Sequence, residues 1–159
     1  MRALVITVSN RAAAGIYPDK SGPLLATLLR EAGCDPVDGP HVVPDGDPVE
    51  AVIWKGVREG YDVIVTTGGT GVTPMDVTPE ITRRILDREI PGIAEAIRQV
   101  NRDKVPTSIL SRGLAGQAGN TLIVNLPGSS GGVRDGMAVL APVLAHVVDQ
   151  IHGGDHPRS

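Results

Sequence analysis

The stretch VIVTTGGTGVTPMDVTPE, residues 63–80, indicates the fold class of this chain. Residues 63–67 are all β-branched, which is typical of a buried strand. Glycines at 68, 69 and 71 then break the strand, and Thr78-Pro79-Glu80 predicts a helix that Thr78 caps, with proline at its first position. A strand, a glycine turn and a helix in succession favour a βαβ unit and therefore a parallel sheet.

The rest of the chain repeats this alternation of short apolar runs and helical periodicity. Strands are predicted at residues 4–8, 36–43, 63–67 and 121–126, the last in a hairpin with residues near Leu114. Helices are predicted at 20–32, after an Asp47 cap, after Thr78, after Pro91 and at 133–151, where Pro142 should kink or split the helix. We therefore expect one α/β domain with a mainly parallel sheet over residues 1–151 and a flexible tail at 152–159.

Composition and charge exclude several classes of protein. The net charge is −3 and the sequence has no block of Lys or Arg, so no nucleic-acid partner is expected. Cys34 is the single cysteine, which excludes an internal disulfide and a multi-cysteine metal site. The first apolar run is too short for a signal peptide or a membrane span, so we expect a cytoplasmic protein that does not bind membranes.

Polar loops follow each of the predicted parallel strands. They cover residues 9–11, 44–45, 68–76 and 125–130. In an open parallel sheet, ligands bind beyond the carboxyl ends of the strands, so we expect these loops to share one edge and one site.

The loop TTGGTG, residues 66–71, has the properties of an anion-binding loop. Its glycines offer backbone N–H groups that no Cβ obstructs, and Thr67 and Thr70 add hydroxyls. It matches neither G-x-x-x-x-G-K-[ST] nor G-x-G-x-x-G, which argues against the common nucleotide motifs and against a dinucleotide-binding oxidoreductase. A purely structural turn remains an alternative interpretation.

A second glycine-bearing loop, NLPGSSGG at 125–132, precedes the last predicted helix. It would aim further N–H groups and a helix N-terminus at the same edge. The alternative is a turn in which Ser129 or Ser130 only caps the helix.

Two carboxylates, Asp45 and Asp76, follow neighbouring predicted strands and would lie near these loops. Carboxylates repel phosphate unless a cation lies between them, and Mg²⁺ is the usual cation at such sites. Both residues are also common in ordinary turns. Arg11, Lys20 and Arg112 are candidates for neutralising a bound anion, and no Ser-His-Asp or Cys-His arrangement is present.

Several separated motifs resemble one known family. They are VTTGGTG at 65–71, D-V-T-P-E at 76–80, N-L-P-G-S at 125–129, V-S-N-R-x-x-x-G-x-x-x-D-K-S-G-P at 8–23 and P-T-S-I-L-S-R at 106–112. Together they resemble the molybdenum cofactor biosynthesis family of MogA/MoaB type, the molybdopterin adenylyltransferases, over roughly residues 3–150.

The resemblance implies a three-layer α/β domain, with helices flanking the sheet, that binds molybdopterin and ATP as substrates. Active members transfer AMP to the terminal phosphate of molybdopterin with the help of Mg²⁺ and release pyrophosphate. The attacking phosphate oxygen is already anionic, so no Ser, Cys or His nucleophile is required. A homotrimer is implied, for which the apolar face at 133–151 is a candidate surface, as is hand-over to a molybdate-inserting protein.

The resemblance also assigns roles to residues of this sequence. Its catalytic and Mg²⁺-binding acidic pair falls on Asp45 and Asp76. The substrate- and cofactor-binding positions are Thr67, Gly68, Gly69, Thr70, Gly71, Glu80, Ser108, Ser111, Arg112, Asn125, Pro127, Gly128 and Ser129. An alternative from another functional class is a non-catalytic oligomeric protein that binds molybdopterin or a nucleotide.

Overall fold

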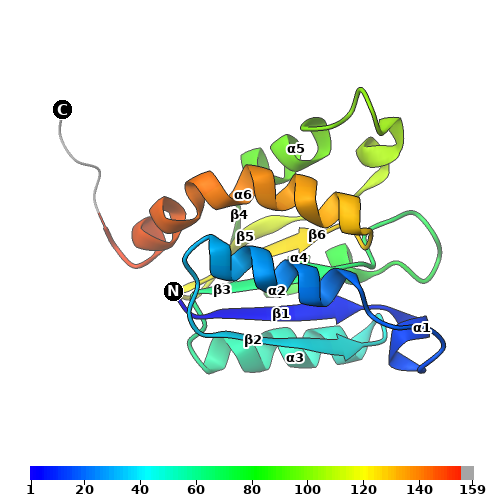
Figure 1. The fold of residues 1–159 in the computed structure, drawn as a ribbon. Helices are drawn as coiled ribbons and strands as arrows, with labels where there is room; N and C mark the ends of the chain where they lie inside the picture. Colours follow the sequence, from blue (N-terminus) through cyan, green and yellow to red (C-terminus); the bar gives the residue numbers. More distant parts are fainter. Residues whose placement is uncertain (155–159) are drawn as a thin grey trace.

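A six-stranded sheet forms the centre of the computed structural model, which describes residues 1–154 (Figure 1). The strands are β1 (Ala3–Val8), β2 (Val37–Val43), β3 (Val63–Thr67), β4 (Arg88–Glu89), β5 (Ala115–Ala118) and β6 (Thr121–Leu126). Their order is β2-β1-β3-β6-β5-β4, in which the first four strands are parallel, and β5 is antiparallel to both of its neighbours. The predicted hairpin is therefore confirmed as β5–β6.

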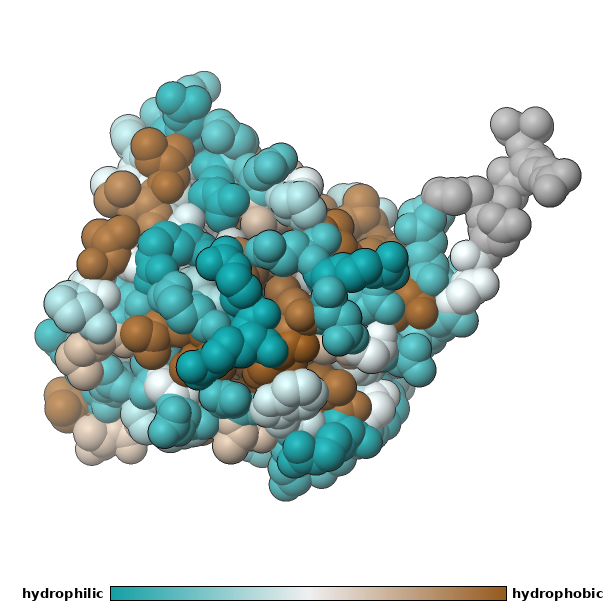
Figure 2. Space-filling view, turned by 180° about the vertical axis from the view of Figure 1, so that it is seen from behind, coloured by the Kyte–Doolittle hydropathy of each residue, from teal (hydrophilic) through white to brown (hydrophobic). Residues whose placement is uncertain are grey.

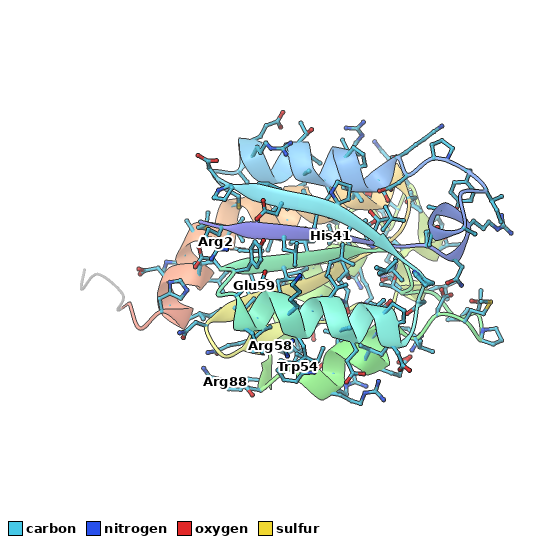
Figure 3. The ribbon with its side chains drawn as sticks, turned by 90° about the horizontal axis from the view of Figure 1, so that it is seen from below. Arg2, His41, Trp54, Arg58, Glu59 and Arg88 are labelled. Carbon is cyan, nitrogen blue, oxygen red and sulfur yellow. The ribbon has the colours of Figure 1, made fainter. Side chains whose placement is uncertain are left out.

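Helices cover both faces of the sheet. They are α1 (Asn10–Ala13), α2 (Ser21–Glu31), α3 (Asp47–Arg58), α4 (Thr78–Ile85), α5 (Pro91–Gln99), the 3-10 helix η1 (Pro106–Leu110) and α6 (Ser130–Ile151). Residues of α2, α5 and α6 form one apolar core with the sheet, and residues of α3 and α4 form the other. Figure 3, an edge-on view, shows strands between α2 and α3, and the expected three-layer α/β fold is confirmed.

The two cores explain why the residues of the central strands are all buried and mostly apolar. In β1 all six residues are buried, with Ala3 and Val5 in the α2/α6 core and Leu4 and Ile6 in the α3/α4 core. Successive side chains of a strand point to opposite faces, and here both faces are covered.

Of the two predicted effects of Pro142 on the last helix, α6, a kink or a split, the split is wrong. The helix runs from Ser130 to Ile151 with Pro142 inside, on its exposed side. By length and composition α6 could cross a membrane, but its buried side chains, such as Met137, Leu140 and Leu144, pack into the core of this domain. The apolar face at 133–151 thus packs against the sheet, and the prediction that it is a surface for subunit contacts was wrong.

Two helix starts also differ from the sequence interpretation. Asp47 and Thr78 are the first residues of α3 and α4, and Gly46 and Val77 occupy the cap positions. Thr78 does not cap α4, because it is already the first residue of the helix, and its Oγ1 donates to Asp45 Oδ1 at 3.0 Å. Asp45, distant in the sequence, thus contacts the start of α4 through Val77 N and Thr78 Oγ1.

Smaller features were not predicted at all. The expected loop after β1 contains the short helix α1, whose N-cap Ser9 accepts a hydrogen bond from Ala12 N at 3.1 Å. At the predicted tail, His152 Nε2 lies 3.2 Å from Asp62 Oδ1. Residues 155–159 of that tail lie outside the described residues.

Candidate functional site

A cavity of about 1020 Å³ lies at the carboxyl edge of the parallel strands, the side toward which the β1 and β2 arrows of Figure 1 point. Loops after β1, β3 and β6 line it, as predicted, whereas the turn after β2 lies behind this lining. Predicted site residues in the lining are Thr67, Gly68, Gly69, Thr70, Gly71, Asp76, Ser108, Ser111, Pro127, Gly128 and Ser129. Asp45, Glu80, Arg112 and Asn125 are not part of the lining.

The first glycine loop presents unpaired donors. Gly68 and Gly69 have φ values of +100° and +70°, which only glycine adopts readily. Gly68 N donates to Leu126 O at 3.0 Å, but the N–H groups of Gly69, Thr70 and Gly71 have no hydrogen-bond partner among residues 1–154. Such a run of unpaired N–H groups in a cavity wall is suited to phosphate or carboxylate oxygens.

The second glycine loop contacts the first. Thr67 Oγ1 donates to Pro127 O at 2.8 Å, and a Cβ on Gly128 would lie 3.2 Å from Gly68 Cα. Ser129 caps α6 by accepting from Gly132 N at 2.9 Å, so this cap interpretation is correct. Since Gly128 and Ser129 also line the cavity, the two loops form one continuous wall.

Asp45 stabilises this wall from outside the cavity. Its carboxylate accepts hydrogen bonds from Gly46 N at 2.8 Å, Val77 N at 3.0 Å and Thr78 Oγ1 at 3.0 Å. A Cβ on Gly69 would lie 2.5 Å from Asp45 Oδ2. Both carboxylate oxygens are therefore engaged within the protein, and Asp45 joins the turn after β2 to the start of α4.

Asp76 is placed differently, because it lines the cavity. Its Oδ2 accepts from Thr73 N at 3.0 Å and Thr73 Oγ1 at 2.8 Å, and its Oδ1 has no hydrogen bond in the described structure. The part of the chain that is described contains no group of three His, Cys, Asp or Glu residues that could hold a metal ion. A cation such as Mg²⁺ would fit here only with Asp76 as a carboxylate ligand and substrate oxygens and waters as the others, a common arrangement for Mg²⁺.

Arg112 and Glu80 bind each other outside the cavity. Arg112 Nη1 lies 2.8 and 2.6 Å from the two carboxylate oxygens of Glu80. The hydrogen bonds that Arg112 donates to Glu80 are the main reason that the pKa of Arg112 is raised above its ordinary value. The Arg112 guanidinium is thus already neutralised by a protein carboxylate.

Asn125 is an internal hydrogen-bonding residue, only 2% exposed. Its amide nitrogen donates to Thr66 Oγ1 at 3.0 Å and Thr82 Oγ1 at 3.1 Å, and its oxygen accepts from Leu114 N at 3.1 Å. It joins β6 to α4 and to the segment before β5, which leaves it no hydrogen for a ligand.

Two cations do line the cavity, Lys20 and Arg134. Neither side chain has a hydrogen-bond or ion-pair partner in the described part of the chain, and both residues are exposed. Lys20 precedes α2, where Asp19 fixes the loop by accepting from Thr7 Oγ1 at 2.8 Å and Gly22 N at 3.0 Å. Arg11, the other candidate before α2, lies on α1 and does not line the cavity.

Sequence reasoning missed Arg134. The available signal was its position, five residues after the Ser129 cap and so within the first turns of a helix that starts at the site. Asp135, beside it, also lines the cavity and accepts from Asn101 Nδ2 at 3.1 Å, which joins α6 to the segment after α5.

The opposite edge of the sheet carries charged residues with internal roles (Figure 3). Arg2 donates to Glu59 O at 3.0 Å and lies 4.6 Å from the centre of the Tyr61 ring. Tyr61 OH donates to Asp38 Oδ2 at 2.5 Å, and this hydrogen bond is the main cause of a raised pKa at Tyr61. The cavity at this end, next to His41, is only about 100 Å³, too small for a nucleotide.

Comparisons with known proteins agree with this geometry. The family described as "Probable molybdopterin binding domain" matches residues 4–146. A solved structure described as the anomalous substructure of MogA is 54% identical, with a TM-score of 0.92, and the match covers 95% of this chain and 99% of that chain.

Two curated relatives give the same family. The molybdopterin adenylyltransferase of Helicobacter pylori (strain J99) is 36% identical over 152 residues, which are 94% of this chain and 86% of that protein. The molybdenum cofactor biosynthesis bifunctional protein of Chlorobaculum tepidum is 36% identical over 157 residues, which are 98% of this chain. The chain spans 50% of the length of that bifunctional relative.

We predict that Gly69→Ala lowers the free energy of unfolding by about 2 to 4 kcal/mol, measured by urea denaturation. The new Cβ would lie 2.2 Å from Thr78 Oγ1 and 2.5 Å from Asp45 Oδ2, at a φ of +70°. Gly92→Ala is the matched control, because a Cβ there meets nothing within 4 Å and it should change stability by less than about 1 kcal/mol. Equal stabilities of the two variants would contradict the role assigned to Asp45.

Proposed function

The chain belongs to the family of probable molybdopterin binding domains, and on this premise we propose that it is an Mg²⁺-dependent molybdopterin adenylyltransferase. It transfers AMP from ATP to the terminal phosphate of molybdopterin and releases pyrophosphate. The alignment with the Helicobacter pylori relative covers 94% of this chain. That relative is named a molybdopterin adenylyltransferase, which supports the assignment as an enzyme of molybdenum cofactor biosynthesis.

The observation that carries the proposal is the contact between the two glycine loops in one cavity wall. Gly68 and Gly128 lie against each other, and unpaired N–H groups of Gly69, Thr70 and Gly71 stand beside them. A reaction between two phosphate groups requires many short donors close together, because both substrates are anions that repel each other.

The chemistry requires no side-chain nucleophile. An oxygen of the molybdopterin phosphate attacks the α-phosphorus of ATP, the new P–O bond forms, and the bond between the α-phosphorus and the bridging oxygen breaks to release pyrophosphate. The protein aligns the two phosphates and stabilises the charge that develops on the leaving group.

Lys20 and Arg134 are the groups we assign to charge neutralisation. Both line the cavity and both lack a protein partner in the described residues, unlike Arg112. They extend from α2 and α6, which lie on the same face of the sheet, and a cation on a flexible stem can follow a phosphate as charge moves.

Asp76 is the residue we assign to Mg²⁺, because it is a cavity carboxylate with an oxygen that no protein group occupies. When bound, Mg²⁺ neutralises phosphate charge and polarises the phosphoryl oxygens. The carboxylate of Asp45 keeps the glycine loop and α4 in place, so its contribution to catalysis is positional.

The proposal also includes a cytoplasmic homotrimer that passes its product to a molybdate-inserting protein. Large apolar side chains are exposed near the cavity, namely Ile16, Val72, Met75, Ile109 and Leu110. Figure 2 shows separate apolar patches along its left edge, on an otherwise largely hydrophilic surface. Such patches support contacts with other protein surfaces.

The direct test is to incubate the protein with molybdopterin, ATP and Mg²⁺ and to measure adenylylated pterin and pyrophosphate. We expect both products in equal amounts, and removal of the metal with EDTA should lower the rate about 100-fold or more. Binding of both substrates without product would instead identify a non-catalytic binding protein.

We predict that Asp76→Asn lowers kcat/KM at least about 100-fold, while the urea unfolding midpoint stays near that of the unchanged protein. Asp45→Asn should instead lower the free energy of unfolding by about 1 to 3 kcal/mol, since an amide nitrogen cannot accept the hydrogen bonds made by Asp45. Full turnover by Asp76→Asn would remove the metal role from Asp76.

For Lys20→Ala and Arg134→Ala, we predict about tenfold weaker binding of pyrophosphate in each case, measured by calorimetry at fixed salt. Each loss removes a cation from the cavity without opening the core. Arg30→Ala, near the opposite end of α2, is the matched control and should bind pyrophosphate unchanged. Equal affinities in all three variants would show that these cavity cations do not bind the anion.

A further inference from the structure

Arg112 contacts the glycine loop from outside the cavity with its backbone N–H and two of its three guanidinium nitrogens. Its Nε donates to Gly71 O at 2.8 Å and its Nη2 to Asp76 O at 2.6 Å. Its backbone N–H donates to Thr70 O at 2.8 Å. One residue therefore binds three carbonyl groups of the segment 70–76, at both ends of the loop that carries the Asp76 carboxylate.

These contacts fix which way the peptide groups of the loop face. Carbonyl oxygens that pointed into the cavity would repel phosphate, whereas N–H groups attract it. The carbonyls of Thr70, Gly71 and Asp76 point to Arg112, which does not line the cavity. The carbonyl of Thr70 belongs to the same peptide group as the N–H of Gly71, which has no partner in the described structure. The N–H groups of Gly69 and Thr70, just before it, have no partner there either.

Glu80 holds the Arg112 guanidinium in this orientation. It accepts from Nη1 with both carboxylate oxygens, at 2.8 and 2.6 Å, from the first turn of α4. A carboxylate placed against the guanidinium both orients it and satisfies its charge. A lysine could not do the same work, because an ammonium is a point charge with no planar fork.

We propose that Arg112 and Glu80 are a positioning pair, a clamp that holds loop 70–76 and the Asp76 carboxylate in the anion-binding conformation without touching the substrate. The part of this inference that concerns turnover rests on the proposed function. The opposing hypothesis is that the Arg112 cation binds a substrate phosphate directly.

The two hypotheses predict opposite effects of Glu80→Gln on anion binding. If Arg112 contacted phosphate, removal of the neighbouring negative charge would leave its cation more available, and pyrophosphate would bind as tightly as before or more tightly. If the pair is a clamp, the loop loosens and pyrophosphate binds about tenfold more weakly.

The experiment compares Glu80→Gln and Arg112→Lys with Glu50→Gln in the full-length protein. Glu50 makes the same kind of ion pair, with Arg84 Nη2 at 2.9 Å, but it joins α3 to α4 and touches no loop of the cavity. The measurements are pyrophosphate affinity by calorimetry, the urea unfolding midpoint and amide hydrogen exchange by peptide mass spectrometry.

We expect both clamp variants to increase about tenfold the exchange of the hydrogen-bonded amides of Gly68, Thr73 and Asp76, read in peptides that cover residues 68–76. Their unfolding midpoints should stay close to that of Glu50→Gln. Pyrophosphate affinity should fall about tenfold in Glu80→Gln. It should also fall in Arg112→Lys, although lysine keeps the positive charge, because an ammonium lacks the planar geometry of a guanidinium. If Glu80→Gln proves too unstable to measure, Arg112→Lys still tests the clamp by its exchange. Unchanged exchange at 68–76, or tighter pyrophosphate binding by Glu80→Gln, would overturn the proposal.

Turnover separates this inference from the function itself. With an active wild-type protein, Glu80→Gln should lower kcat as well as affinity, because Asp76 is displaced, and Glu50→Gln should retain both. If the wild-type protein forms no adenylylated pterin, the proposed function fails, and the exchange and pyrophosphate measurements still decide whether the clamp exists.

Discussion

The parallel pairing of β3 with β1 and β6 is the constraint on which the site depends. Thr67 lies opposite Thr7 in β1 and opposite Leu126 in β6, so the three strands end at nearly the same level. The chain must then turn three times within a small area. There Gly68 approaches Val8 O so closely that a Cβ would lie 2.1 Å from it, and only glycine fits.

The glycines of this wall have no side chains that could fix their own peptide groups. The charged residues around it therefore divide into two groups. Asp45, Glu80 and Arg112 lie outside the cavity and bind the loop by its peptide groups or by the residues that follow it. Asp76 and Arg134 line the cavity and keep atoms without a protein partner in the described structure. This division matches the needs of a phosphate site, in which donors are fixed in advance and charged groups in the cavity stay available to the ligand or its cation.

Much of the fold could be read from local pattern, and the exceptions have physical causes. The bounds of β3 and β6 were predicted as found, because each is a short buried run of mainly β-branched and apolar residues. Pro142 did not split α6, because it lies on the exposed side while Leu140 and Leu144 pack into the core. Thr78 did not cap α4, because the helix begins one residue earlier than predicted and Thr78 is its first residue, where its hydroxyl donates to Asp45.

The sequence by itself determined the α/β class, the succession of the central strands and helices along the chain, and the two glycine loops. These features depend on residues that are neighbours in the sequence. The sequence could not determine which charges face the ligand. Arg112 was paired with Glu80, 32 positions away, and Asp45 with the start of α4. Lys20 and Arg134, far apart in the chain, came to line one cavity because α2 and α6 pack on the same face of the sheet. These pairings depend on tertiary packing, because a charged side chain binds the groups that the fold brings within hydrogen-bond distance.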